Sequence, residues 1–265
     1  MGNMTLCAKY VDEHMAEEFA KVCEEYGIDC KIPACDTVVC ETVNEAWEYW
    51  FVRLFAMARV NAATAKSRDG AVAAEVIGAV TKVMDPTRFI VTSPVRKLPM
   101  RYAVGELLWY LSGSNKLKDI SVFTPNWERM SDDGETVNSC YGHKIHYFFG
   151  FDQWQDVKER LIEDPSSRQA IIHIKDPRPV SMPTNDTPCT LTLQFLQREG
   201  KLHLIVNMRS NDLWFGMPYD MFSFCSLQVK MAMELGLEVG TYTHVAGSLH
   251  VYERDLCKAH KHGKT

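Results

Sequence analysis

Three short polar stretches in the second half of the chain could carry chemistry, and the first surrounds a cysteine. In Thr187-Pro188-Cys189-Thr190 the proline stiffens the approach, and Cys189 stands where a β-strand is expected to begin. A thiolate is a strong nucleophile, so a cysteine placed in this way could attack an electrophilic carbon. A single cysteine is otherwise a small buried thiol, and this segment by itself does not separate the two interpretations.

The second stretch, residues 207–220, gathers Arg, Ser, Asn and Asp between an expected strand end and an expected helix start. Such loops often bind anions, because exposed backbone amides and a helix N-terminus favour negative charge. A polar loop with satisfied caps is the alternative. In that interpretation Asp220 simply lies at the N-terminus of the helix that follows.

The third stretch runs from Gly247 to Tyr252. Strand alternation places Ser248, His250 and Tyr252 on one face. Three hydrogen-bonding side chains on one strand face indicate a ligand or a polar network, although a single histidine is more often a satisfied core residue.

The elements that must position these stretches are helices and strands without a regular βαβ rhythm. Apolar spacing predicts helices over residues 11–26, 45–63, 99–112, 151–163 and 219–235, and strands over residues 170–174, 191–197, 201–208 and 241–252. Two alternating strands around Arg198-Glu199-Gly200 predict a hairpin. The expected class is α+β, with a mixed or antiparallel sheet packed with helices.

Composition excludes several classes of protein. The 265-residue chain carries 29 Lys and Arg against 34 Asp and Glu, a net charge of −5, which argues against a nucleic-acid polymer as partner. Neither a membrane-spanning apolar run nor a secretory signal is visible, so a cytoplasmic protein without a membrane partner is expected. Nine cysteines in a reducing compartment make a disulfide framework unexpected. Cys30, Cys35 and Cys40 are evenly spaced, but without a CxxC pair buried thiols are favoured over zinc.

In order and spacing, several motifs resemble the thymidylate synthase superfamily. The resemblance runs from about Arg68 to Tyr252 and rests on Pro188-Cys189, Gln194-Phe195, Arg209-Ser210-x-Asp212, Gly216-x-Pro218, His250-x-Tyr252, Glu106-Leu107-Leu108-Trp109, Gly113-Ser114, Trp127 and Tyr141-Gly142. It implies a thymidylate synthase-like fold and a homodimer joined through the sheet. Residues 1–40 would form an N-terminal extension, and residues 41–265 the catalytic domain.

The resemblance implies covalent catalysis on a pyrimidine nucleoside monophosphate. The one-carbon co-substrate would be 5,10-methylenetetrahydrofolate, and no metal is expected. A Cys189 thiolate added to C6 turns C5 into an enamine-like carbon that can attack an electrophilic methylene. Glu106 matches the carboxylate that orders water and moves protons at the base, and Tyr141 lines the pocket. Because free thiols are mostly protonated at pH 7, a cation must help, and Arg209 matches that cation.

The remaining matches assign the ligand contacts. The phosphate is expected to meet Arg68 from a mobile loop, Arg168 donated across the dimer interface, Arg209 and Ser210. The sugar and the pocket are expected to involve His250, Tyr252 and Gln194, and the folate side Trp127, Asp212 and Gly216. Local arginines thus allow an acidic protein to hold an anionic nucleotide.

Two departures from the family pattern bear on substrate and product. Uracil-binding members carry Asn where this chain has Asp220, and an aspartate suits the N4 amino group and N3 of cytosine. Met130 replaces a usual tryptophan, and a lost aromatic wall would admit water, giving a hydroxymethyl product. The prediction is a folate-dependent C5 hydroxymethyltransferase converting dCMP, or CMP. Thymidylate synthase-type reductive methylation of dUMP or dCMP is the alternative. A cysteine hydrolase using Cys189 and His250, and a non-catalytic nucleotide sensor, are further alternatives.

Overall fold

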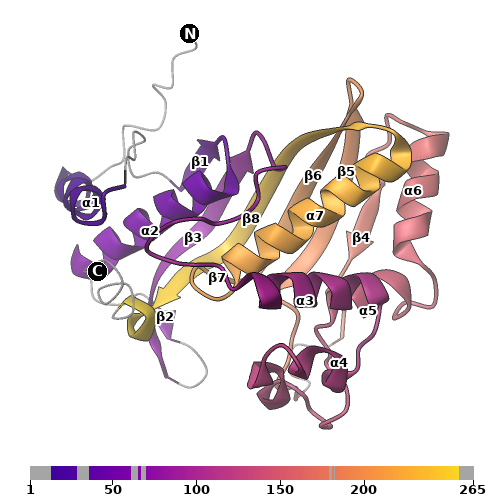
Figure 1. Cartoon of the computed structure of the whole chain (residues 1–265), viewed down its shortest axis with the longest axis horizontal. Coiled ribbons are helices and arrows are strands. Elements are labelled where there is room, and N and C mark those ends of the chain that lie inside the picture. The colour runs from indigo at the N-terminus through magenta and orange to yellow at the C-terminus, as the bar shows by residue number, and fades with distance from the viewer. Residues whose placement is uncertain are drawn as a thin grey trace.

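The computed structural model describes residues 13–28, 36–60, 65–66, 70–178, 181 and 183–256. Its centre is one mixed β-sheet with strand order β1-β3-β8-β6-β5-β4, to which β2 is added beside β3 and β7 beside β8 (Figure 1). The strands are β1 (Thr37–Cys40), β2 (Ala65–Lys66), β3 (Val72–Val83), β4 (Ile171–His173), β5 (Thr190–Arg198), β6 (Lys201–Met208), β7 (Asn211–Asp212) and β8 (Glu238–Tyr252).

The pairing of these strands confirms the predicted α+β class. β5 and β6 form the predicted antiparallel hairpin, whose turn places Glu199 and Gly200 at φ 52° and 74°. β6 and β8 are parallel, as are β1 and β3, while β3 and β8 are antiparallel. The long strand β3 was not predicted. Its sequence is rich in alanine and contains Gly78 at φ 73°, and both features weaken a strand signal.

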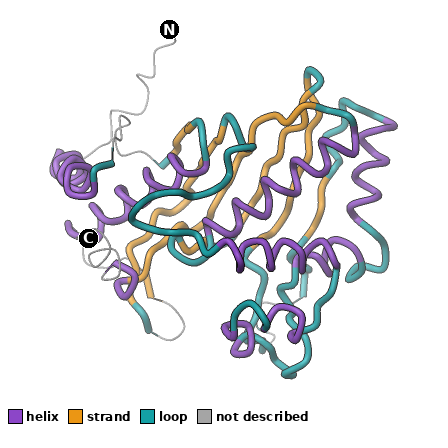
Figure 2. The backbone as a smooth tube through the Cα atoms, in the orientation of Figure 1, coloured by secondary structure: helices purple, strands orange, loops and turns teal. Residues whose placement is uncertain are grey.

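Helices cover one face of this sheet (Figure 2). α7 contacts β6 and β8, α2 contacts β3, α3 packs beside α7, and α6 packs on β4 at the sheet edge. The helices are α1 (Glu13–Tyr26), α2 (Val43–Val60), α3 (Met100–Ser112), α4 (Leu117–Ser121), the 3₁₀ helix η2 (Pro125–Arg129), α5 (Tyr141–His146), α6 (Gln153–Glu163) and α7 (Met217–Leu235).

The ends of the predicted helices follow from local chemistry. Pro99 is the N-cap residue of α3, and Gly113 ends that helix in the left-handed conformation at φ 66°. Gly236 ends α7 in the same way, at φ 68°. α7 begins at Met217, earlier than predicted, because Pro218 is itself accommodated in the first turn.

The hydrophobic core lies between α2, α7 and the sheet, and it includes Trp47, Trp50 and Phe51 of α2, all fully buried. Part of the expected extension joins this core. Phe19 of α1 is buried there, and β1 pairs with β3 as an edge strand of the sheet. The division of the chain at residue 40 stays an expectation, while the described parts of residues 13–40 pack as one body with the rest.

Two sequence predictions concern cysteines and membranes. Within the described residues the free thiols are Cys23, Cys40, Cys140, Cys189 and Cys225. Cys30 and Cys35, the other members of the evenly spaced group, lie outside the described residues. In the same part of the chain no helix is long and apolar enough to cross a membrane, and no group of His, Cys, Asp and Glu could hold a metal ion.

Candidate active site

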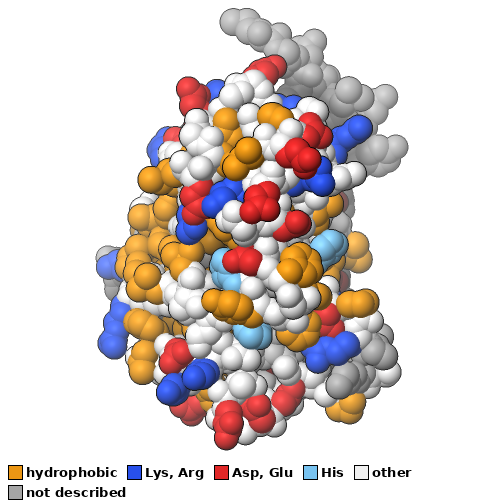
Figure 3. Space-filling view, turned by 90° about the vertical axis from the view of Figure 1, so that its right-hand side faces the viewer, with side chains coloured by type: hydrophobic (Ala, Val, Ile, Leu, Met, Phe, Trp, Pro, Cys, Tyr) orange, Lys and Arg blue, Asp and Glu red, His pale blue; other side chains and the backbone are white. Residues whose placement is uncertain are grey.

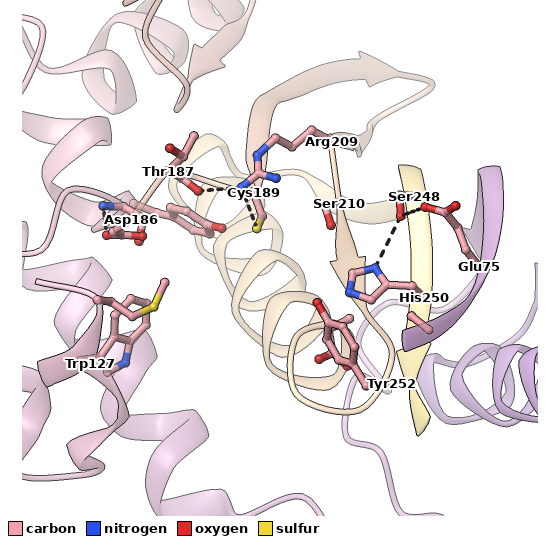
Figure 4. Close-up of a pocket in the computed structure, with 15 residues that line it drawn as sticks. Glu75, Trp127, Asp186, Thr187, Cys189, Arg209, Ser210, Ser248, His250 and Tyr252 are labelled. Atoms are coloured by element: carbon pink, nitrogen blue, oxygen red, sulfur yellow. Dashed lines mark hydrogen bonds between the residues drawn. The ribbon is translucent and has the colours of Figure 1, made fainter. Parts of the chain in front are cut away.

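A pocket of about 510 Å³ is lined by β3, β7, β8, the 3₁₀ helix η2, the start of α5, and the loops that precede β5 and follow β6. Cys189 lies between Trp127 on one side and His250 and Tyr252 on the other (Figure 4). Of the predicted site residues, the lining contains Trp127, Tyr141, Cys189, Arg209, Ser210, Asp212, His250 and Tyr252. Residues that are far apart in the sequence therefore meet at one cavity.

Arg209 holds the loop that carries Cys189. Its Nε donates to the carbonyl oxygen of Pro188 at 3.0 Å, and its Nη2 donates to that of Thr187 at 2.8 Å. The same Nη2 lies 3.5 Å from Cys189 Sγ, so the predicted cation does adjoin the thiol. The β5–β6 pairing explains this, because the Arg209 amide donates to the Cys189 carbonyl at 2.9 Å.

The thiol is nevertheless held in its neutral form in the free protein. Burial raises the pKa of Cys189, and the positive charge of Arg209 opposes that rise. The negative charges of Asp186 and Asp212 add to the rise. We therefore expect the thiol to ionise only when a bound ligand alters the charges or the solvent around it.

Glu106 lies behind the pocket lining, buried on α3 and joined to Trp127 by hydrogen bonds. Trp127 Nε1 donates to the Tyr102 hydroxyl at 3.0 Å, and Tyr102 donates to Glu106 Oε1 at 2.6 Å. Burial raises the pKa of Glu106 to about 7, although hydrogen bonds from Tyr102 and Tyr110 favour the charged form. A carboxyl group with this pKa can exchange protons near neutral pH.

Tyr141, at the start of α5, lines the same pocket as Cys189. Its hydroxyl accepts a hydrogen bond from the Thr190 amide at 3.4 Å, and its ring stacks on Phe224 of α7 with centroids 5.9 Å apart. Burial raises the pKa of Tyr141 well above 10, so the phenol remains protonated. It can therefore act as a hydrogen-bond donor beside Cys189.

A carboxylate that the sequence did not predict lies beside His250, on the neighbouring strand. Ser248 Oγ donates to Glu75 and lies 3.5 Å from His250 Nδ1 (Figure 4). Glu75 belongs to β3, pairs directly with His250 and lines the pocket. Without a prediction of β3 there was no signal to find it. Hydrogen-bond acceptors therefore lie on two adjacent strands, β3 and β8, on the side of the pocket where the sugar is expected to bind.

Asp220 is not a helix cap. Gly216 is the N-cap residue of α7, and no side chain caps that terminus. Asp220 Oδ2 instead accepts a hydrogen bond from Asn211 Nδ2 at 2.7 Å. Burial, together with the charge of Glu106, raises the pKa of Asp220 well above its usual range. The raised pKa favours the protonated form of this carboxyl group, which lies behind the pocket lining.

Several predicted residues lie away from this pocket's lining. Gln194 donates from Nε2 to the carbonyl oxygen of Arg168 at 2.9 Å, and Arg168 itself is exposed. Gly216 packs against the loop, where an added Cβ would lie 3.0 Å from the Asp212 carbonyl oxygen and 3.1 Å from Asn211 Nδ2. Arg68 lies outside the described residues.

Asp212 lines the pocket, and its carboxylate accepts hydrogen bonds from two backbone amides. Oδ1 accepts hydrogen bonds from the Trp214 amide at 2.7 Å and the Phe215 amide at 3.2 Å. These bonds fix the loop between β7 and α7. Asp212 and Trp127 line the same pocket, and both are positions that the resemblance assigned to folate contact.

Comparison with known proteins gives consistent matches. The family model for thymidylate synthase matches residues 51–263. The chain is 36% identical to a deoxyuridylate hydroxymethyltransferase of Bacillus phage SP01 over 167 residues, covering 58% of this chain and 44% of that protein. It is 31% identical to a thymidylate synthase of Bacillus atrophaeus over 169 residues, covering 61% of this chain and 74% of that protein. The match thus spans less than half the length of the phage relative.

A solved structure also matches. The crystal structure of thymidylate synthase from T4 phage superposes with a TM-score of 0.63 at 25% sequence identity, covering 74% of each chain. This match supports the predicted fold.

Proposed function

Since the chain belongs to the thymidylate synthase family, we propose that it is a folate-dependent hydroxymethyltransferase that acts on C5 of a cytosine nucleotide, with dCMP as its substrate. The observation that carries the choice of cytosine is the side chain of Asp220, a partly buried carboxyl group that does not cap α7, accepts a hydrogen bond from Asn211 and has a raised pKa that favours its protonated form. A carboxylic acid offers a donor and an acceptor side by side, and cytosine presents the complementary acceptor N3 and donor N4 amino group.

The pocket residues supply the chemistry in sequence. Arg209, which adjoins Sγ, stabilises the Cys189 thiolate as it adds to C6 of the base and breaks the C5–C6 double bond. The electron pair gained at C5 forms a bond to a methylene carbon at the oxidation level of formaldehyde, which is what methylenetetrahydrofolate supplies. Glu106, through ordered water, accepts the proton lost from C5. As that proton is lost, the bond between the transferred carbon and the folate nitrogen breaks, which releases tetrahydrofolate and leaves an exocyclic methylene at C5. Water then adds to this methylene, and the Cys189 thiolate leaves as the C5–C6 double bond forms again.

The balance of this reaction is dCMP, methylenetetrahydrofolate and water converted to 5-hydroxymethyl-dCMP and tetrahydrofolate. Nothing is oxidised or reduced overall. Trp127 and Met130 fit a folate ring on the open side of the pocket, because both line it and an aromatic face suits a flat heterocycle. Met130 is 36% exposed and is narrower than a tryptophan, which supports access of water.

The choice between hydroxymethylation and reductive methylation has a direct test. Hydroxymethylation regenerates tetrahydrofolate, whereas methylation oxidises it to dihydrofolate, which absorbs differently. We expect no dihydrofolate absorbance during turnover of dCMP, and a product heavier than dCMP by the elements of formaldehyde. Formation of dihydrofolate with a methylated product would instead support the thymidylate synthase reaction.

Replacement of Asp220 by Ala tests the base preference. Asn211 and the pocket wall stay in place, but cytosine loses both the donor for N3 and the acceptor for its N4 amino group, while uracil, which needs the opposite pattern, loses no favourable pair. One mismatched buried polar group costs about 1–3 kcal/mol, which is about 5- to 160-fold in specificity. The ratio of kcat/KM for dCMP to that for dUMP is expected to fall by this factor. An unchanged ratio would remove the main support for cytosine.

Arg168 does not line the pocket of its own chain, but in the predicted homodimer it could bind the phosphate in the partner's pocket. Arg168 is exposed and follows α6 in the chain. Figure 3 shows hydrophobic and charged side chains together on the face of the molecule that it presents. Phe151, which precedes α6, and Ile162, within α6, are exposed. We propose that Arg168 contacts the phosphate held in the partner's pocket.

Mixing subunits tests this arrangement. Arg168→Ala and Cys189→Ala homodimers are each expected to be inactive or strongly impaired. A mixture allowed to exchange subunits should regain up to about one quarter of wild-type activity, because a mixed dimer keeps one complete site and random pairing makes half of the dimers mixed. Full activity in a monomeric wild-type protein, measured by sedimentation, would contradict shared sites.

A cysteine hydrolase is less well supported. The described contact of the Cys189 thiol is Arg209, while the ring nitrogen Nδ1 of His250 faces Ser248. A general base for a cysteine nucleophile must lie within hydrogen-bond reach of it.

A further inference from the structure

A buried chain of hydrogen bonds leads away from Asp220 and takes no direct part in the proposed reaction. Asn211 Nδ2 donates to Asp220 Oδ2 at 2.7 Å, and Asn211 Oδ1 lies 3.1 Å from His244 Nε2. His244 Nδ1 lies 2.7 Å from the Tyr242 hydroxyl. Asn211 and His244 expose 2% of their surface and Tyr242 exposes none. Tyr242, His244 and Asn211 are called the orienting chain below.

The hydrogen bonds of the orienting chain have one direction that satisfies every member. Burial lowers the pKa of His244 to about 4, so the ring is neutral at pH 7, with one nitrogen protonated and the other free to accept. Within the described residues, the hydrogen-bond partner of the Tyr242 hydroxyl is His244 Nδ1. The buried hydroxyl hydrogen is satisfied only if it is donated to that nitrogen. Nε2 then carries the ring proton and donates to Asn211 Oδ1.

This direction fixes the amide of Asn211. Its oxygen is occupied by His244, so its NH₂ group must face Asp220. The reverse direction would require a flipped amide and would leave the buried Tyr242 hydroxyl hydrogen without an acceptor among the described residues. Asp220 Oδ2 is therefore held as an acceptor, and no hydrogen bond within the described part of the chain engages Oδ1.

We propose that the orienting chain selects cytosine over uracil by fixing where Asp220 carries its proton, on Oδ1 and not on Oδ2. This inference rests on the proposed function. With the proton on Oδ1, the carboxyl group donates to cytosine N3 and accepts at Oδ2 from the N4 amino group. Uracil, with O4 and N3–H, needs the opposite position, in which Oδ2 would be protonated while it faces the Asn211 donor.

The surroundings of Asp220 agree with this assignment. A proton is available, because burial and the neighbouring Glu106 and Asp212 carboxylates all raise the pKa of Asp220. Gly216 allows the close packing of the amide, since a Cβ there would lie 3.1 Å from Asn211 Nδ2. Tyr242 and His244 stand outside the pocket lining, so they act through Asn211 and are positioning residues.

A Tyr242→Phe variant tests the inference from the far end of the chain. It keeps the buried ring, leaves Asp220 and Asn211 intact and removes the donor that sets the direction, so either histidine tautomer and either amide orientation becomes allowed. We expect the dCMP to dUMP ratio of kcat/KM to fall about 5- to 10-fold, the effect of one neutral hydrogen bond. Tyr49→Phe, a change at a buried tyrosine of α2 remote from the pocket, should leave the ratio unchanged. An unchanged ratio in Tyr242→Phe, with a wild type that prefers dCMP, would overturn the inference.

The tautomer of His244 gives a readout that needs no substrate. Nitrogen-15 NMR of the wild type is expected to show His244 neutral and protonated at Nε2, with the signal assigned by its loss in His244→Gln. Protonation at Nδ1 would overturn the orienting chain whatever the enzyme acts on. A wild type that prefers dUMP while His244 is protonated at Nε2 would instead overturn the choice of cytosine. The two failures are therefore distinguishable.

Discussion

A Cys189→Ala variant is expected to bind nucleotide nearly as well as the wild type and to lose turnover by roughly 10⁴- to 10⁶-fold, the scale seen when a covalent nucleophile is removed. The thiol lies at the centre of the pocket, 3.5 Å from Arg209 Nη2, and no other described cysteine lines that pocket. Without addition at C6, C5 of the pyrimidine is not activated.

Release of tritium from C5-labelled dCMP reports this step directly, and calorimetry reports nucleotide binding. Cys23→Ala, which alters a partly buried thiol on α1, is the matched control and should release tritium as the wild type does. Release at the wild-type rate from Cys189→Ala would contradict covalent activation by this residue.

Replacement of Glu106 by Gln is expected to reduce kcat about 10²- to 10⁴-fold, the contribution of a positioned acid or base. The amide keeps the size of the side chain and can still accept from Tyr102, but it cannot take up the C5 proton. Because the pKa of Glu106 is raised to about 7, wild-type kcat/KM should fall as the pH drops below that value and the carboxylate becomes protonated. This inflection should be absent in the variant. If it persists unchanged, it belongs to another group.

Stability provides the control for Glu106→Gln. A carboxyl group whose pKa rises on folding binds more protons in the native state between its unfolded value of 4.5 and about 7, so it lowers stability as the pH rises through that range. The neutral amide removes this penalty. The variant should therefore unfold at a Tm equal to or above that of the wild type at pH 8. A lower Tm would mean that the loss of activity includes a folding defect.

Local signals were sufficient to predict several elements. Pro99 and Gly113 bracket α3, and alternation on either side of Gly200 identified the β5–β6 hairpin. β3 escaped because its alanines and Gly78 carry little strand signal, although it pairs with β8 at the centre of the sheet. The parallel pairing of β6 with β8 joins segments that have no local contact in sequence.

The site also contains residues that the sequence could predict and residues that it could not. Motif resemblance was enough to place Cys189, Arg209 and His250 together, and the structure brings them to one pocket. Glu75 and the link from Asn211 to His244 depend on strand register, and the latter joins residues 33 positions apart. The two interpretations of Asp220, as helix cap or as site residue, also needed the structure, which places Gly216 at the N-cap of α7 and the Asp220 carboxyl group against Asn211.

The central claim, hydroxymethylation of cytosine in dCMP, is tested most directly by competition. Equal concentrations of dCMP and dUMP are incubated with the enzyme and methylenetetrahydrofolate, and both nucleotide pools are analysed by mass spectrometry at low conversion. The ratio of products gives the ratio of kcat/KM without separate kinetics. The account predicts 5-hydroxymethyl-dCMP as the main product, and a main product derived from dUMP, hydroxymethylated or methylated, would contradict it.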